Sequence, residues 1–121
     1  MGMYRGNRMK ENQTVLCGAS AYEQKYYFNQ EFSALPQTIK EDLQILCVTF
    51  TEEIGGIMTM FFDEEGNLKF ETEALDSDGM YDEIGGALKI KKICQERQEF
   101  LLSLETYYRV VFLGEELEEK E

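Results

Sequence analysis

The chain of 121 residues contains no histidine and no tryptophan, and it has a single proline. Without histidine it cannot form a Ser-His-Asp triad or a Cys-His pair, and it lacks the side chain that most readily acts as a general base near neutral pH. A zinc site would need three thiolates and a carboxylate, because no imidazole is available. The sequence therefore favours a protein that is not an enzyme and that uses no metal or cofactor.

Basic residues are also scarce. The chain has 12 Lys and Arg against 24 Asp and Glu, which gives a formal net charge of −12 at pH 7. Lys and Arg are the residues that bind phosphate backbones and anionic membrane surfaces, so this balance argues against a nucleic acid or a membrane as partner. Two interpretations remain: the acidic balance simply keeps the protein soluble, as in many acidic bacterial domains, or it suits a more basic partner protein reached by electrostatic steering.

Long apolar runs are absent as well. No stretch approaches the roughly 20 residues of a membrane-spanning helix, and the N-terminus lacks the apolar core of a signal peptide. Cys17, Cys47 and Cys94 are far apart and form no Cys-x-x-Cys pair. Unpaired thiols of this kind are typical of buried residues in a reducing compartment, so we expect a cytoplasmic protein with buried free cysteines.

The clearest element that the sequence does contain is a β-hairpin. Residues 57–62 are almost wholly apolar, and residues 68–74 alternate between apolar and polar, as a strand with one buried face does. Gly66, in the intervening DEEGN, can adopt the positive φ that closes a type I turn with a bulge. This turn sets the register, and the predicted apolar face consists of the pairs Phe62–Leu68, Met60–Phe70 and Met58–Thr72.

The opposite face of the hairpin carries Ile57 and Phe61 beside charged residues. Soluble monomers seldom leave a contiguous apolar patch uncovered. A third strand, residues 14–28 or the arm before them, a second copy of the chain or a native partner could each supply the cover. We predict that this face is a homodimer contact or a partner-binding site.

Two further strands are predicted at residues 14–17 and 25–28, where Val, Leu, Cys, Tyr and Phe gather. The GASAYEQ stretch between them has the composition of a turn or bulge. The alternative for this region is a single helical turn over residues 22–27.

Two amphipathic helices complete the pattern. The first opens at Pro36, where the missing N–H costs nothing, and ends at Gly55 and Gly56, which favour a left-handed cap. The second begins with Asp82 as its N-cap and ends within residues 106–112, where the sequence also has strand character. The apolar stripe of the first helix consists of Ile39, Leu43, Leu46, Cys47, Phe50 and Ile54.

This pattern predicts an α+β fold, in which two amphipathic helices pack on one face of an antiparallel sheet of three to four strands. We expect a disordered polar arm over residues 1–13 and a disordered acidic tail over residues 115–121. The residues between them, 14–114, form a single domain that is long enough to bury a core.

Arg97 breaks the pattern of the second helix, because it falls in the middle of the apolar stripe. An unpaired buried guanidinium is too costly, so three interpretations are open. The side chain extends past the core to water, it pairs with a carboxylate within the fold, or it binds a ligand or a partner.

The connector before the second helix contains Asp76, Asp78 and Asp82, which resemble a loose calcium loop. An EF-hand requires an oxygen ligand at its fifth position, Gly at its sixth and Glu at its twelfth. The residues at those positions are Met80, Tyr81 and Ala87. Helix capping and a solvated acidic loop are therefore favoured over a divalent-cation site.

Tyrosine is abundant in this chain, with seven residues. Tyr offers a large rigid area with a polar tip, and for that reason it is enriched at interfaces. Tyr22 and Tyr26 join Ile57 and Phe61 as candidate partner-binding residues. The other interpretation is that these tyrosines lie at the edge of the core.

Three blocks of the sequence carry a resemblance to a known family: CGASAYEQKYYFN, LPQTIKEDLQILCVTFTEEIGG and FFDEEGNLKFE. Over residues 14–114 the chain resembles a family of small acidic proteins from Firmicutes that has no assigned activity. The resemblance implies a bacterial cytoplasmic setting. The order of a helix, a Gly-Gly pair and a hairpin is also similar to that of bacterial immunity proteins, which neutralise basic toxins.

Taken together, these features predict a non-enzymatic protein-binding module, of an adaptor or immunity-like kind. The alternative is a small-molecule or divalent-metal-dependent activity centred on Arg97 or on the acidic connector over residues 76–82.

Overall fold

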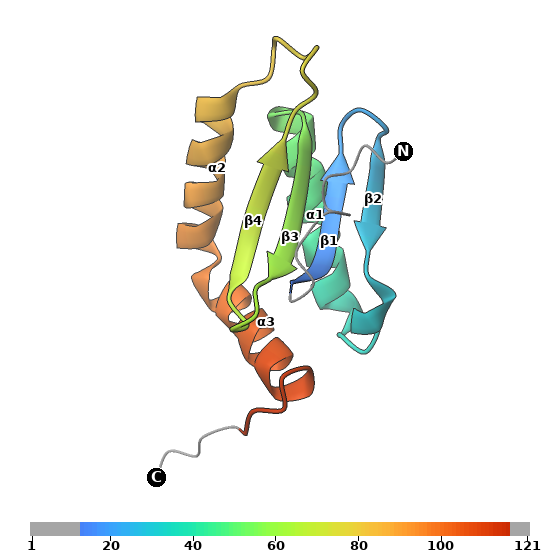
Figure 1. Ribbon diagram of the computed structural model, residues 1–121, viewed down its shortest axis with the longest axis vertical. Helices are drawn as coiled ribbons and strands as arrows, with labels where there is room; N and C mark the ends of the chain where they lie inside the picture. The colour runs from blue at the N-terminus through green and yellow to red at the C-terminus, as the bar shows by residue number, and fades with distance from the viewer. Residues whose placement is uncertain (1–12, 117–121) are drawn as a thin grey trace.

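The computed structural model describes residues 13–116, which form a four-stranded antiparallel sheet with three α-helices and a short 3-10 helix (Figure 1). The α+β prediction is thus confirmed. The predicted arm and tail lie almost wholly outside the described residues. The elements are β1 (Thr14–Ser20), β2 (Lys25–Phe28), η2 (Gln30–Phe32), α1 (Gln37–Glu53), β3 (Ile57–Phe62), β4 (Leu68–Glu73), α2 (Glu83–Glu96) and α3 (Gln98–Val111).

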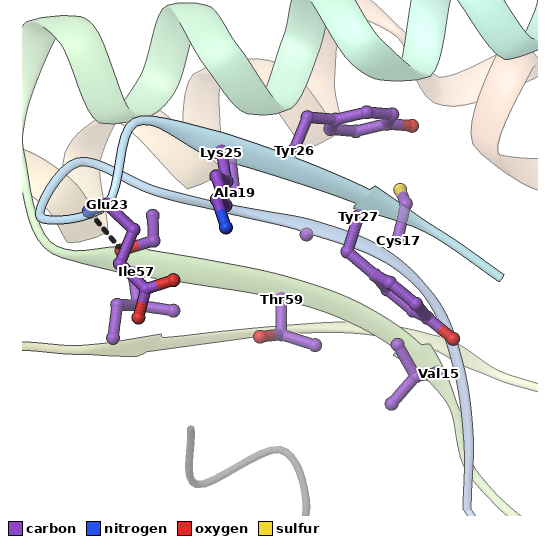
Figure 2. Close-up of a pocket in the computed structure, with 11 residues that line it drawn as sticks. Val15, Cys17, Ala19, Glu23, Lys25, Tyr26, Tyr27, Ile57 and Thr59 are labelled. Atoms are coloured by element: carbon purple, nitrogen blue, oxygen red, sulfur yellow. Dashed lines mark hydrogen bonds between the residues drawn. The ribbon is translucent and has the colours of Figure 1, made fainter. Parts of the chain in front are cut away.

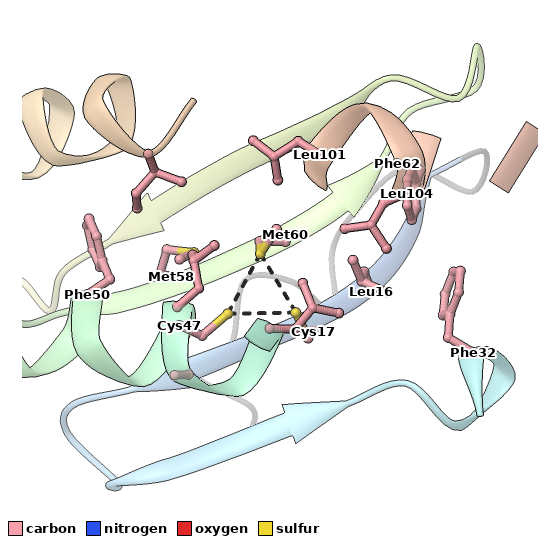
Figure 3. Close-up of a cluster of buried hydrophobic side chains, with 14 of the residues drawn as sticks. Leu16, Cys17, Phe32, Cys47, Phe50, Met58, Met60, Phe62, Leu101 and Leu104 are labelled. Atoms are coloured by element: carbon pink, nitrogen blue, oxygen red, sulfur yellow. Dashed lines mark hydrogen bonds between the residues drawn. The ribbon is translucent and has the colours of Figure 1, made fainter. Parts of the chain in front are cut away.

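The strands lie in the order β2-β1-β3-β4, with α1 behind the sheet and α2 along its flank beside β4 (Figure 1). A single core forms between one face of the sheet and the helices (Figure 3). Its largest fully buried side chains are Phe32, Phe50, Phe62, Leu16, Leu43, Met58 and Met60. Among residues 13–116, none of the helices is long and apolar enough to cross a membrane.

The β3–β4 hairpin has the predicted register, with Phe62 opposite Leu68 and Met58 opposite Thr72. Gly66 has a φ of 88° and its N–H donates to the carbonyl of Asp63, as the turn requires. The Asp63 carboxylate accepts hydrogen bonds from the N–H groups of Glu65 and Asn67, each at 2.9 Å. Burial acts to raise the pKa of Asp63, but these bonds, led by that from Asn67, hold it below its ordinary value.

Helix α1 also follows the prediction. Pro36 stands just before its first residue, and Gly55 and Gly56 end it with φ values of 98° and 73°. The predicted apolar stripe faces the sheet and includes the fully buried Leu43 and Phe50.

Strand β1 is longer than predicted, because residues 18–20 belong to the strand rather than to a turn. The register shifts between Val15 and Cys17, so Leu16 is the extra residue of a β-bulge. A bulge turns consecutive side chains to the same side. Leu16 and Cys17 are therefore both fully buried, which an unbroken alternation would not allow.

The prediction of a second continuous helix is wrong, because the helical segment breaks at Arg97 into α2 and α3. Arg97 has φ −115° and ψ 31°, outside the helical region, although its N–H still bonds to the carbonyl of Ile93 at 2.8 Å. No Gly or Pro marks this break in the sequence. It allows α3 to turn its apolar side to the core, and the segment after Tyr107 is helical to Val111.

Candidate functional site

The predicted partner-binding residues Ile57 and Phe61 lie on the face of the sheet opposite α1. On β4 they are paired with Glu73 and Lys69, as predicted from the turn. Ile57 is only 5% exposed, and Phe61 is partly buried. The apolar area that this pair offers to a partner is therefore smaller than the sequence suggests.

A cavity of about 510 Å³ lies on this face (Figure 2). Its apolar lining includes Val15, Ile57 and the ring of Tyr27, and Thr59 lies between them. The charged side chains in its lining are Glu23 and Lys25. The cavity is thus a mainly apolar hollow without a convergent set of catalytic groups among the described residues.

Tyr22 and Tyr26 are both partly buried within the fold. The Tyr22 hydroxyl donates to Asp78 at 2.6 Å and accepts from the N–H of Leu75 at 3.1 Å, which ties the β1–β2 turn to the connector before α2. Burial, followed by the hydrogen bond to Asp78, raises the pKa of Tyr22. Tyr26 points towards α1, whereas Ile57 lies on the opposite side of the sheet (Figure 2). The structure therefore does not gather the four predicted residues on one surface.

Arg97 lies at the junction of α2 and α3, with a half-exposed side chain. Its guanidinium is 3.6 Å from the Asp42 carboxylate of α1 and lies 4.5 Å from the centre of the Phe100 ring. Two of the predicted interpretations, partial exposure and an ion pair within the fold, thus describe its placement. The contacts tie the junction to α1, and a half-exposed pair of this kind contributes about 0–1 kcal/mol.

Two aspartates of the acidic connector accept hydrogen bonds within the fold. Asp78 accepts hydrogen bonds from Tyr22 and from the N–H of Met80. Asp82 caps α2 by accepting from the N–H of Gly85 at 2.8 Å, as predicted. Within residues 13–116, no three His, Cys, Asp or Glu side chains come together in a way that could hold a metal ion.

Three sulfur atoms meet in the core between β1, α1 and β3 (Figure 3). The Cys17 and Cys47 Sγ atoms are 3.6 Å apart, and the Met60 Sδ is 3.8 Å from each of them. The hydrogen bond with Cys17, together with burial, raises the pKa of the Cys47 thiol well above its ordinary value. We call these three residues the sulfur cluster. All three cysteines are free, but Cys94, which was expected to be buried, is exposed on α2.

The Tyr26 side chain lies on the same side of the sheet as the Cys17 thiol, facing α1 (Figure 2). Burial, followed by the neighbouring thiols of Cys17 and Cys47, raises its pKa far above the ordinary value. Among the described residues its hydroxyl is a buried side-chain oxygen without a hydrogen-bond partner. Such a group is costly to bury, so the burial of this hydroxyl without a partner calls for a physical explanation.

A surface that the sequence analysis missed lies on the outer side of α2. Ile84 and Leu88, one turn apart, are 75% and 61% exposed, and Met80 in the preceding turn is 90% exposed. We call these three residues the α2 patch. The sequence did contain a signal for this exposure. At about 100° per residue, Ile84 and Leu88 each lie more than about 100° around the helix from the inward-facing Ile90, so they fall on its outer side. The signal was overlooked because apolar side chains are usually taken to be buried.

No curated protein and no solved structure matches this chain. The predicted Firmicutes source and cytoplasmic setting therefore stay predictions. One family does match, over residues 13–116, and this range includes every strand and helix described above. The chain belongs to this family, the family of unknown function DUF6145.

Proposed function

We propose that this domain is a non-enzymatic protein-binding module, and that it docks the α2 patch into an apolar groove on a partner protein. The observation that carries the proposal is the exposure of Ile84 and Leu88 on adjacent turns of one helix. Single exposed apolar residues are common on soluble proteins, whereas apolar residues that adjoin one another more often mark an interaction surface.

The manner of docking follows from the spacing of the patch. Apolar residues at positions i and i+4 of a helix are the anchors that a partner groove accepts when it binds an amphipathic helix. Helix α2 already meets the fold through Gly86 and Ile93, which are both buried. Ile84 and Leu88 are therefore not needed for the core and are available to a partner.

The charge around the patch favours a basic partner. Asp82 and Glu83 stand at the N-terminal end of α2, and the connector before it adds Asp76. A partner groove with Lys or Arg at that end would complement these carboxylates and would be steered towards a chain of net charge −12. A second copy of the chain would bring the same acidic residues and the same net charge, which disfavours self-association through this patch.

The contacts of the other candidate groups support binding over the alternative activity. Arg97 pairs with Asp42, Asp78 is held by Tyr22, and Asp82 caps α2. These groups already have partners within the fold, so neither Arg97 nor the acidic connector needs a small molecule or a divalent cation to explain its chemistry.

The test begins with a partner captured from a lysate of the source organism, purified and titrated against the isolated domain by calorimetry. We expect Ile84→Glu and Leu88→Glu each to weaken binding by about tenfold or more, because each places a charge in an apolar contact. Leu102→Glu is the matched control, since Leu102 is a 51% exposed leucine on α3. It should leave the affinity unchanged.

Two results would overturn the proposal. Equal weakening by Leu102→Glu and Leu88→Glu would show that the effect is not specific to the patch. Binding, or dimerisation measured by sedimentation, that Phe61→Glu abolishes and Leu88→Glu leaves intact would move the interface to the hairpin face that the sequence predicted.

A further inference from the structure

We propose that the sulfur cluster of Cys17, Cys47 and Met60 is a binding site for Cu(I) in the core of the domain. This inference is independent of the proposed protein-binding function, because it rests on different residues. The sulfur atoms come from β1, α1 and β3, and Figure 3 shows them facing one another.

The distances between the sulfurs suit a single bound ion. For sulfurs that are 3.6 and 3.8 Å apart, a central point lies about 2.2 Å from each, close to the roughly 2.3 Å of a zinc–thiolate bond. A metal could therefore bond to all three sulfurs with little movement of the backbone.

The fold holds these donors in place before any ion arrives. Cys17 and Met60 are direct partners across β1 and β3, so their side chains lie on the same face of the sheet. The bulge at Leu16 sets that alignment, and α1 brings Cys47 over the pair. A site made from three packed elements loses little conformational freedom when it binds.

The donor set selects the ion. Thiolate and thioether sulfurs are polarisable donors that suit soft ions such as Cu(I) and also zinc. Structural zinc takes four ligands, and the described residues supply no group of three His, Cys, Asp or Glu that could hold it. Three sulfurs without a fourth donor among residues 13–116 thus favour Cu(I) over zinc.

The charge balance gives Tyr26 a role. Binding of Cu(I) releases one proton from each thiol to solvent and transfers no electron, so two thiolates and one monovalent cation leave a single negative charge in the core. The Tyr26 hydroxyl has no hydrogen-bond partner among the described residues, and it lies on the same side of the sheet as the Cys17 thiol (Figure 2). A movement of the ring would let it donate a hydrogen bond to a thiolate. Second-shell donors of this kind orient and stabilise metal ligands.

A hollow of about 520 Å³ lies near the site, although none of the three cluster residues lines it. It is lined by Ala19, Tyr26, Gln44 and Val48, and so lies between β1, β2 and α1 on the side of the sheet that carries the cluster. Val48 adjoins Cys47 in sequence, and Tyr26 lies on the same side of the sheet as the Cys17 thiol (Figure 2). Movement of the Tyr26 ring would open the cluster to an ion delivered at this hollow.

The test is an anaerobic titration with Cu(I) in competition with a chromogenic chelator such as bicinchoninate. All proteins carry Cys94→Ala, so that the exposed thiol cannot bind copper. We expect one Cu(I) per chain, a thiolate-to-Cu(I) charge-transfer band in the ultraviolet, and a higher melting temperature of the loaded protein. X-ray absorption should report three sulfur neighbours.

The variants separate ligand loss from misfolding. Cys47→Ala should abolish binding, and Met60→Leu, which keeps the volume and removes the sulfur, should weaken it by about tenfold or more. Tyr26→Phe removes only the hydroxyl and should weaken binding by about tenfold. Circular dichroism of each variant without copper checks that it is folded.

Three outcomes would overturn the site. The chelator could remove all copper from the parent protein. Cys47→Ala could retain copper with the parent's affinity. Folded Met60→Leu could bind as tightly as the parent and show only two sulfur neighbours, which would exclude the three-sulfur site.

Discussion

Helices α1 and α2 have similar lengths and both carry apolar residues on more than one turn, yet they relate to the sheet in different ways. Helix α1 buries Leu43, Leu46 and Phe50 in the core. Helix α2 buries Ile93 and Gly86, and it leaves Ile84 and Leu88 exposed. The difference teaches that α1 belongs to the core, whereas α2 is attached along one side and leaves its outer side available for binding.

The contacts of α2 are correspondingly weak. Lys89 pairs with Glu53 at the end of α1, with 2.7 Å between nitrogen and oxygen. Gly86 approaches the side chains of Phe50 and Ile54. A surface ion pair contributes about 0–1 kcal/mol, whereas full burial of one large apolar side chain contributes about 1.5–3 kcal/mol. Substitutions in α1 should therefore cost more stability than comparable ones in α2.

The largest effect is expected from Phe50→Ala in α1. Phe50 is fully buried, so its truncation should leave a cavity and lower the free energy of unfolding by about 3–5 kcal/mol. Denaturant unfolding measures the change. A loss below about 1 kcal/mol would contradict the view that α1 forms the core.

Gly86→Leu tests how closely α2 approaches α1. A Cβ at this position would already lie 3.2 Å from the Tyr81 hydroxyl and 3.3 Å from the Ile54 Cγ2. The larger side chain should push α2 outwards and cost about 1–3 kcal/mol in denaturant unfolding. Ala87→Leu is the matched control, because the neighbouring Ala87 is exposed; it should have little effect. Equal costs for the two variants would show that the contact at Gly86 is not close.

Asp82→Ala tests whether α2 depends on its own cap. The substitution removes the hydrogen bond to the N–H of Gly85 and should cost about 1 kcal/mol. Amide hydrogen exchange should accelerate in the first turn of α2 and remain unchanged in α1. Asp76→Ala, at an exposed position of the same connector, controls for the loss of a negative charge. Global destabilisation without local fraying would mean that α2 and the core unfold together.

The smallest effect on stability is expected from Leu88→Gln on the outer side of α2. Because the side chain is largely exposed, the free energy of unfolding should change by less than about 0.5 kcal/mol. Partner binding should nevertheless weaken, which separates a binding role from a structural one. A stability loss above about 2 kcal/mol would mean that Leu88 packs within the fold.

The roles of individual polar residues could be predicted where they depend on neighbours in sequence. The cap at Asp82 follows from the start of a helical pattern. The position of Arg97 in an apolar stripe left three alternatives, an exposed guanidinium, an ion pair or a bound ligand or partner, and its placement fits the first two. The bond between Tyr22 and Asp78 could not be predicted, because the two residues are 56 positions apart. Nor could the sulfur cluster, whose members are linked only through strand pairing and helix docking.

The sequence by itself determined the hairpin and the limits of α1, because both depend on local rules. Alternation selects the buried face of a strand, and glycine at Gly55, Gly56 and Gly66 supplies the positive φ that ends the helix or closes the turn. Tertiary structure alone decided three further features. The bulge at Leu16, the break at Arg97 and the exposure of Ile84 arise from how strands pair and helices pack, and no local pattern records which side of an apolar segment the rest of the chain will cover.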